Sequence, residues 1–465
     1  MAWGGIRLRG LRLVIWYDVL ALAHGESSHP GTRGPGDGVG LTLGAVTSAL
    51  TARPSAVDIE AAFVRLRGVV TETPLRRSVR LSEATGAQVW VKREDLQPVR
   101  SYKLRGAYNV IAQLPDAARE RGVVCASAGN HAQGFAYACA RLGYEGRVYV
   151  PRTTPRQKRE RILALGEGHV QIIVGGDTYD DAAASSVEDA ERTGATPVPA
   201  FNHPDTIAGQ GTLAVEIVDQ LGHAPDVLVL PVGGGGMLAG CATWLRSRHP
   251  GVRLVGAEPA GAASMAAALT AGEPLDLDDI ETFVDGAAVR RVGELTFEIA
   301  RDSGVELVAV DEGRICTEIL DLYQVDGVIA EPAGALSSAA LLDKVSVTPG
   351  QEVVVVLSGG NNDVSRYAEI VERSLVNLGR KHYFLVNFPQ EPGALRRFVD
   401  EVLGPDDDIA LFEYVKRSNR ETGPALVGIE LGRKEDLEGL LLRMDESNMV
   451  VERIPADSPF YRFLV

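Results

Sequence analysis

The chain contains little cysteine and no close cysteine pair. Its four cysteines, Cys125, Cys139, Cys241 and Cys316, are far apart in 465 residues, and none belongs to a C-x-x-C motif. Each is embedded in apolar sequence, which favours buried free thiols over disulfides or metal ligands. We therefore expect a protein of a reducing compartment, the cytoplasm.

Positive charge is also scarce. The formal net charge is −15, and no long run of lysine or arginine offsets it locally. A field of this sign repels nucleic-acid phosphates and anionic lipids. We therefore expect neither nucleic acid nor a membrane as a partner.

The sequence has little that resembles a targeting or membrane segment. The stretch 13–23 follows Arg7, Arg9 and Arg12, but Asp18 interrupts it, and it is shorter than the about 20 apolar residues that a spanning helix needs. Residues 24–40 are rich in glycine, serine and proline, which is typical of disorder. We expect residues 1–45 to be a dispensable, disordered extension rather than a signal or transit peptide.

The rest of the chain has an ordinary globular composition, with 45% hydrophobic and 23% charged residues. Over 56–371, short β-branched runs alternate with helical periodicity, which predicts an α/β domain with a largely parallel sheet. Near Arg380 the pattern changes to a β-α-β-β-α-β order, typical of a small ferredoxin-like domain. Its predicted elements are 382–388, 393–403, 409–415, 425–431, 435–444 and 449–454. We expect a large domain over 46–375 and a small one over 376–465.

A lysine lies at the predicted start of a helix. In the stretch Ser101–Gly106 (SYKLRG), helical spacing begins at Leu104, and Ser101 is the expected N-cap. The positive end of the helix dipole disfavours an ammonium group at Lys103, which favours the neutral amine that a Schiff base needs. Taken alone, the position fits an ordinary surface lysine better.

A second polar stretch, Ser127–His131 (SAGNH), follows the predicted strand 122–126 and opens a helix. Backbone N–H groups at such a junction can hold a carboxylate, and the Asn130 amide can reach a ligand oxygen. A simple capped loop explains the stretch equally well.

Consecutive glycines form a third motif between the predicted strand 226–232 and a helix that includes Met237; they are Gly233, Gly234, Gly235 and Gly236. Glycines let the backbone approach a phosphate closely and direct several N–H groups at it. The loop matches neither the dinucleotide fingerprint nor the P-loop. A phosphate site is favoured over a tight structural turn, without identifying whose phosphate it is.

The fourth motif, Ser358–Asn362 (SGGNN), follows the predicted strand 353–357. Ligands bind open α/β sheets where the carboxyl ends of strands meet loops, so we expect the four motifs to converge on one crevice. Beside a helix-starting lysine and a phosphate loop, Ser358 becomes a candidate partner for a cofactor ring.

Together, and in this order, the four motifs resemble those of the fold-type II pyridoxal-phosphate enzymes, specifically the threonine dehydratases. The resemblance runs from about residue 56 to the C-terminus. It implies a tryptophan synthase β-like catalytic domain with two open α/β subdomains. It also implies a threonine ammonia-lyase that converts L-threonine to 2-oxobutanoate and ammonia, the first committed step of isoleucine biosynthesis.

The same resemblance implies roles for single residues. Lys103 would carry the cofactor as a Schiff base and remove the α-proton. The implied cofactor contacts are Tyr102, Asn130 at the phenolic oxygen, Ser358 at the pyridine nitrogen, and Met237 with the four glycines at the phosphate. The implied carboxylate contacts are Ser127, Gly129, Asn130 and His131. Because a serine hydroxyl cannot hold the ring nitrogen protonated, the ring is a weaker electron sink, which favours β-elimination over transamination.

Two positions differ from relatives of the resembled family. Serine racemases resemble this chain except for a serine at Ala128, so a second base is missing and racemisation is disfavoured, while dehydration of L-serine stays open as a side reaction. Relatives can bind a cation at the positions of Glu258, Ala262 and Ser264. Since Ser264 stands where relatives often have an aspartate, we expect a monovalent ion or none there rather than a divalent metal.

The small domain resembles the ACT-like regulatory domain of short biosynthetic threonine dehydratases, through residues 387–389 (NFP) and 392–395 (PGAL). The resemblance implies inhibition by isoleucine, opposed by valine, in a homo-oligomer, a tetramer. Isoleucine would have to bind two global states differently. No effector-binding residue is assigned.

Two other functions stay open at this point. One is a serine/threonine dehydratase of broader role or another fold-type II enzyme, such as a cysteine or threonine synthase. By resemblance, those synthases have Lys-Asp-Arg at the lysine motif, whereas this chain has Lys103-Leu104-Arg105. The other, from a different class, is a non-enzymatic sensor whose glycine loop binds the phosphate of a nucleotide.

Overall fold

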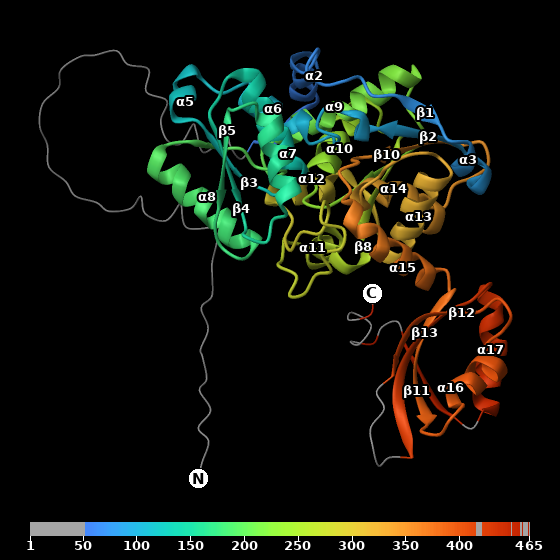
Figure 1. Cartoon of the computed structure of the whole chain (residues 1–465). Helices are drawn as coiled ribbons and strands as arrows, with labels where there is room; N and C mark the ends of the chain where they lie inside the picture. The colour runs from blue at the N-terminus through green and yellow to red at the C-terminus, as the bar shows by residue number, and fades with distance from the viewer. Residues whose placement is uncertain (1–51, 415–420, 448, 456–457, 459–463, 465) are drawn as a thin grey trace, which may run out of the picture. The chain divides into compact units, whose positions relative to one another are not determined.

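The computed structural model describes residues 52–414, 421–447, 449–455, 458 and 464 (Figure 1). The prediction for residues 1–45 concerns a segment outside this range. Among the residues described, no helix combines the length and the apolar character that crossing a membrane requires.

A six-stranded sheet forms the centre of the larger region (Figure 1). All neighbouring pairs are parallel except the edge pair formed by the first two strands. In spatial order the strands are β1 (Leu75–Arg77), β2 (Gln88–Arg93), β10 (Glu352–Leu357), β7 (Val227–Pro231), β8 (Arg253–Pro259) and β9 (Glu306–Val310).

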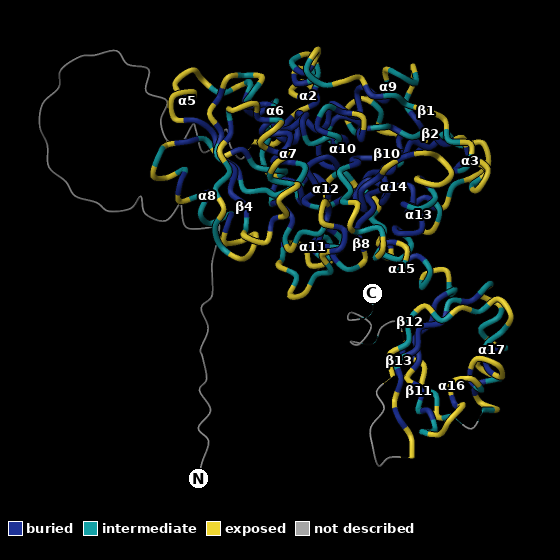
Figure 2. The backbone as a smooth tube through the Cα atoms, in the orientation of Figure 1, coloured by how far each residue is buried: buried dark blue, intermediate teal, exposed yellow. Residues whose placement is uncertain are grey.

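Helices cover both faces of this sheet, as the valine run of β10 predicts. Val353 and Val355 pack into one core, while Val354 and Val356 pack into the core on the opposite face. Strands buried on both faces are typical of parallel sheets, and Figure 2 shows this region as buried. One face carries α2 (Ala56–Arg65), α9 (Pro204–Leu221), α10 (Gly236–Arg248) and α12 (Glu294–Ser303). The other carries α3 (Val79–Thr85), α13 (Glu312–Gln324), α14 (Pro332–Asp343) and α15 (Tyr367–Asn377).

A second, smaller parallel sheet belongs to a second subdomain. Its strands are β5 (Val170–Val174), β4 (Gly146–Val150), β3 (Val123–Ala126) and β6 (Thr196–Pro197). One face packs on α4 (Leu104–Ile111), α5 (Asp116–Arg121), α6 (Asn130–Leu142) and α7 (Arg156–Gly166), and the other on α8 (Tyr179–Thr193). The predicted fold class, two open α/β subdomains, is confirmed.

The C-terminal region has the predicted β-α-β-β-α-β order and an antiparallel sheet of strand order β12-β13-β11-β14. Its elements are β11 (Lys381–Pro389), α16 (Ala394–Arg397) continued by a π-turn over Phe398–Val402, β12 (Asp408–Tyr414), β13 (Thr422–Glu430), α17 (Leu437–Glu446) and β14 (Val450–Ile454). Phe384, Val386 and Phe388 of β11 pack inward, whereas Leu385 between them is 41% exposed. This alternation is that of a sheet with one covered face.

All four cysteines are buried and free, as predicted. Burial raises the pKa of each thiol. A protonated, buried thiol behaves as a small apolar side chain, so these residues are part of the core.

Candidate active site

The first and fourth motifs, more than 250 residues apart in the sequence, are hydrogen-bonded to each other. The Tyr102 N–H donates to the Ser358 carbonyl at 3.1 Å, and the Gly360 N–H donates to the Arg100 carbonyl at 2.9 Å. Ser101 and Gly359 form an antiparallel bridge between them. The lysine segment is therefore held at the carboxyl end of β10.

Lys103 is the N-cap residue of α4, and its side chain lines a cavity with the glycine loop. Nζ donates to the Ala200 carbonyl at 3.2 Å and lies 5.3 Å from the centre of the Tyr102 ring. Burial lowers the pKa of this amine to about 8, against the opposing charge of Glu331. The environment therefore favours a neutral, nucleophilic amine.

Ser101 is not the helix N-cap, so that prediction was wrong. Lys103 takes the N-cap position, and no side chain caps this helix. Ser101 is fully buried in the bridge to Gly359, and its Oγ has no hydrogen-bond partner among the described residues. The strand-like pairing takes the serine out of reach of the first helical turn.

The glycine loop has no room for side chains. A Cβ on Gly234 would overlap the Phe201 ring, and one on Gly236 would overlap Gln210 Oε1. Gly235 has a φ of +86°, a left-handed conformation that favours glycine. It precedes α10, where the first N–H groups lack helical partners. The loop therefore exposes backbone donors to the cavity that it lines with Lys103 and Met237.

The second motif reaches the fourth through Asn130, which begins α6. Its Oδ1 accepts from Asn361 Nδ2 at 2.7 Å, and its Nδ2 donates to Glu331 Oε1 at 2.6 Å. Ser358 is buried, and its Oγ donates to the Ala333 carbonyl at 3.2 Å. Both polar side chains expected near the cofactor ring are thus fixed by contacts to other segments.

The side chain of His131 has no donor to offer a carboxylate. Nε2 lies 2.7 Å from the Val198 carbonyl, which can only accept, so Nε2 carries the hydrogen. The buried Nδ1 then carries a lone pair, which has no hydrogen-bond partner among the described residues. Burial and the charge of Lys103 lower the pKa of this imidazole to about 4. Only the backbone N–H of His131 remains for the predicted contact. In the same loop, Ser127 Oγ accepts from the Gly129 N–H at 3.3 Å.

The carboxylate of Glu258, one of the three residues of the candidate cation site, is hydrogen-bonded to the backbone. Glu258 Oε1 accepts from the Met265 N–H at 2.7 Å and Oε2 accepts from the Ala266 N–H at 2.9 Å, so the carboxylate caps helix α11 (Ser264–Ala271). Burial raises the pKa of Glu258 to about 7, against these two N–H groups. Each oxygen thus accepts one backbone N–H, and Ala262 and Ser264 add no charge.

Sequence reasoning did not single out three residues of this region. Phe201 packs against the glycine loop, Ala200 accepts from Lys103, and Glu331 bonds to Asn130. They come from loops with no motif of their own. A proline after Glu331, a residue typical of a helix start, is the local signal that the sequence offers for this position.

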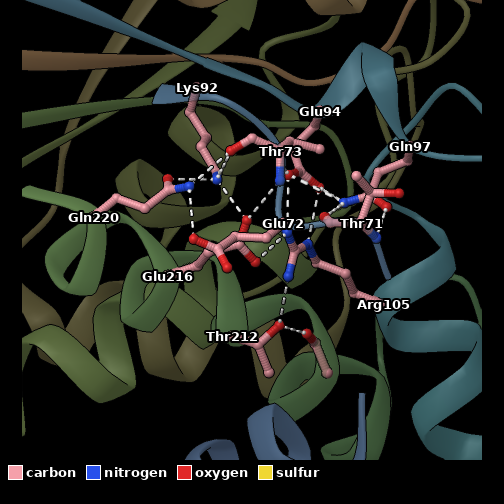
Figure 3. A network of polar contacts seen from close by, with 11 residues as sticks. Thr71, Glu72, Thr73, Lys92, Glu94, Gln97, Arg105, Thr212, Glu216 and Gln220 are labelled. Carbon is pink, nitrogen blue, oxygen red and sulfur yellow. Dashed lines mark hydrogen bonds and ion pairs between the residues drawn. The ribbon is translucent and has the colours of Figure 1, made fainter. Parts of the chain in front are cut away.

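A buried ionic network supports the helix that Lys103 begins (Figure 3). Arg105 binds Glu94 through two hydrogen bonds of 2.8 and 2.9 Å and binds Glu216 through a third of 2.8 Å. Lys92 Nζ lies 2.5 Å from Glu216 Oε1. Burial opposes the charge on Glu94, but the neighbouring cations outweigh it and lower its pKa. Two acids and two bases thus tie α4 to β2 and α9.

These features fit a cofactor that has an aldehyde and a phosphate. An amine with a lowered pKa and a loop of backbone donors line the same cavity, and any Cβ on the loop would overlap neighbouring protein atoms. The uncharged side chains of Asn130 and Ser358 lie on segments that are bonded to the lysine segment or to each other. The residues present therefore fit pyridoxal phosphate.

Comparison with known families agrees with this geometry. The family model described as pyridoxal-phosphate dependent enzyme matches residues 66–359, so the chain belongs to this class and uses pyridoxal phosphate. A second model, the C-terminal regulatory domain of threonine dehydratase, matches residues 372–464. The chain belongs to the biosynthetic threonine dehydratases, as the relatives below demonstrate.

The chain is 62% identical over 413 residues to the biosynthetic L-threonine dehydratase of Mycobacterium tuberculosis, covering 88% of this chain and 96% of the relative. It is 48% identical over 404 residues to that of Bacillus subtilis, covering 87% and 96%. Among solved structures, threonine deaminase isoform 2 of Solanum lycopersicum has a TM-score of 0.65 at 34% identity, covering 70% of this chain and 96% of that one. Maize serine racemase has a TM-score of 0.65 at 29% identity, covering 70% and 99%.

Proposed function

We propose that this chain is a threonine ammonia-lyase that dehydrates and deaminates L-threonine to 2-oxobutanoate and ammonia. The observation that carries the proposal is Lys103, whose pKa is lowered to about 8, in the same cavity as the glycine loop. A sensor that only bound a phosphate would not need a buried amine with a lowered pKa beside it.

The chain's own residues would hold cofactor and substrate as follows. The backbone N–H groups of Gly233 to Met237 would bind the phosphate, with Tyr102 beside the ring. Asn130 would bond the phenolic oxygen, and Ser358 the ring nitrogen. The turn Ser127–His131 would bind the substrate carboxylate through backbone N–H groups at the start of α6 and the Ser127 hydroxyl. Holding the carboxylate fixes which bond to Cα is broken.

Lys103 would move the protons. When bound, pyridoxal phosphate supplies a conjugated ring that withdraws electrons from the substrate's Cα. Nζ of Lys103 takes the proton from Cα, and the resulting ammonium can return a proton to the departing β-hydroxyl. On the other face, Ala128 has no group that exchanges protons, which favours elimination over racemisation. Water then hydrolyses the released enamine, after its conversion to an imine, to the keto acid and ammonia.

The regulatory domain supports control of this activity by an effector. We propose isoleucine as the inhibitor and valine as its opponent, in a cytoplasmic homotetramer. The two small-molecule ligands differ by a methylene group, so an apolar site can distinguish them only modestly, by about 1–3 kcal/mol.

The proposal is tested by assaying 2-oxobutanoate formation from L-threonine. Lys103→Ala should lower kcat roughly 10²- to 10⁴-fold or more, because the general base is lost. Lys344→Ala is the matched control, since Lys344 is exposed and pairs with Asp343 on the surface. If the wild-type protein produced no keto acid at full cofactor occupancy, the proposed function would be wrong.

A further inference from the structure

One buried carboxyl group near the site has no role in the mechanism above. Glu331 directly precedes α14 and is only 6% exposed, yet its side chain does not cap that helix. Its Oε1 accepts from Asn130 Nδ2 at 2.6 Å instead. A buried carboxyl group is costly, and this one accepts a hydrogen bond from Asn130, a residue proposed to contact the cofactor. We therefore expect its role to be functional.

The hydrogen bonds around Asn130 have a fixed direction. The Val99 carbonyl can only accept, so Asn361 Nδ2, at 2.9 Å, must be the donor. The same Nδ2 donates to Asn130 Oδ1, which places the Asn130 amide nitrogen toward Glu331. One hydrogen of that nitrogen goes to the carboxyl group. Among the described residues the other has no assigned partner, and it is available to a ligand oxygen.

The backbone makes room for Glu331 at one position. A Cβ on Gly359 would overlap Oε1 of Glu331, so glycine at 359 is what admits the carboxyl group. The Glu331 N–H donates to the Gly359 carbonyl at 3.2 Å, which anchors the residue to the segment that follows β10. Both ends of Glu331 are therefore held by groups of the site.

Charged groups from several elements act on this carboxyl. Burial, and then the negative charge of Asp285, raise the pKa of Glu331 to about 7, while Asn130, Lys158 of α7 and the Asn361 N–H oppose the rise. In return, the charge of Glu331 raises the pKa of Lys103 and of the buried Tyr102. The lysine amine thus senses whether Glu331 is ionised.

We propose that Glu331 is a positioning residue of the cofactor site, which orients the Asn130 amide toward the phenolic oxygen of the cofactor and places a negative charge near the lysine nitrogen. The inference rests on the cofactor role proposed for Asn130 and Lys103. Asn361 shares the first task, because it holds the other end of the amide, but it carries no charge and has no part in the second.

Two variants separate the two tasks. Glu331→Gln keeps an oxygen that can accept from Asn130 but removes the charge, so the pH midpoint of the bound cofactor's visible absorption band should fall by about one unit or more. Asn361→Ala removes the support of Asn130 and leaves the charge. It should raise the cofactor dissociation constant about tenfold, the effect expected from the loss of one hydrogen bond, without moving that midpoint.

Glu318→Gln is the matched control, because Glu318 of α13 is also a buried glutamate and pairs with Arg80 of α3. It should leave both the midpoint and the cofactor dissociation constant unchanged. An unmoved midpoint in Glu331→Gln would overturn the electrostatic part. Unchanged cofactor affinity in Glu331→Ala, which also removes the acceptor for the Asn130 amide, would overturn the positioning part. Both readouts are made without substrate, so a failure of the proposed lyase activity would be seen separately, in the keto-acid assay.

Discussion

At the scale of single residues, the site depends on groups whose chemistry is altered by burial. The amine of Lys103 is easier to deprotonate because its ammonium form loses hydration, and the His131 imidazole stays neutral for the same reason. Burial therefore gives the two basic side chains different tasks. The lysine loses its proton more readily, whereas the histidine donates from Nε2 to the Val198 carbonyl.

The glycine loop gives a prediction at this scale. Gly234→Ala should raise the cofactor dissociation constant at least about tenfold, because the new methyl overlaps Phe201 and moves the loop that is proposed to bind the phosphate. Gly251→Ala is the control, since a Cβ there meets no atom within 4 Å. It should change the affinity by less than about twofold. Equal affinities in the two variants, measured by titration of each apoprotein with the cofactor, would contradict the assignment.

At the scale of elements, the position of α4 depends on charge pairs as well as on apolar packing. Leu104 and Ala107 are buried, but so is Arg105, which points to Glu94 and Glu216 rather than to water (Figure 3). The first turn of the helix, which follows Lys103, is thus joined directly to Glu94, just after β2, and to α9. Apolar contacts alone tolerate small rotations of a helix, whereas a bidentate pair between an arginine and a carboxylate fixes its orientation.

Breaking this network should destabilise the catalytic region strongly. Glu94→Gln should lower the free energy of unfolding by about 3–5 kcal/mol, because Arg105 stays buried with an incomplete set of counter-charges. Glu60→Gln breaks the surface pair with Arg248 and should cost about 1 kcal/mol or less. Urea denaturation of the two variants measures the difference. Similar shifts of both midpoints would mean that the buried network does not hold α4 in place.

At the scale of the whole molecule, the chain joins a catalytic region to a regulatory region of a different fold class. The parallel sheets and the antiparallel sheet have separate hydrophobic cores. Because the cores are separate, each region can keep its own fold while an effector at the regulatory region changes the activity of the catalytic region. Coupling then requires only that the effector bind two states of the protein with different affinity.

Inhibition by isoleucine is the prediction at this scale. In the full-length protein, isoleucine should raise the threonine concentration needed for half-maximal rate by about 5- to 150-fold, the usual range of allosteric coupling. D-isoleucine is the control, because it has the same apolar surface but the wrong chirality. Valine should counteract the inhibition. Threonine turnover that isoleucine leaves unchanged would rule out the proposed effector while leaving the lyase assignment intact.

The sequence by itself determined the order and type of the main elements, the class of fold and the four motifs proposed to hold the cofactor and the substrate. These follow from local patterns: β-branched runs, helical spacing, and glycines where a strand meets a helix. The strands after 226 and 353 and the β-α-β-β-α-β order near the C-terminus were predicted in this way and are confirmed. Family resemblance added the cofactor, which the comparisons also support.

Only the tertiary structure decided what each polar side chain of the site does. Ser101 pairs with Gly359 instead of capping a helix, the His131 side chain faces a carbonyl, and Glu331 meets Asn130 across 201 positions of sequence. Contacts of this kind depend on how separate segments pack, and no local pattern encodes them. For the same reason Lys103, an unremarkable helix-starting lysine in the sequence, acquires its lowered pKa only when the fold buries it beside the glycine loop.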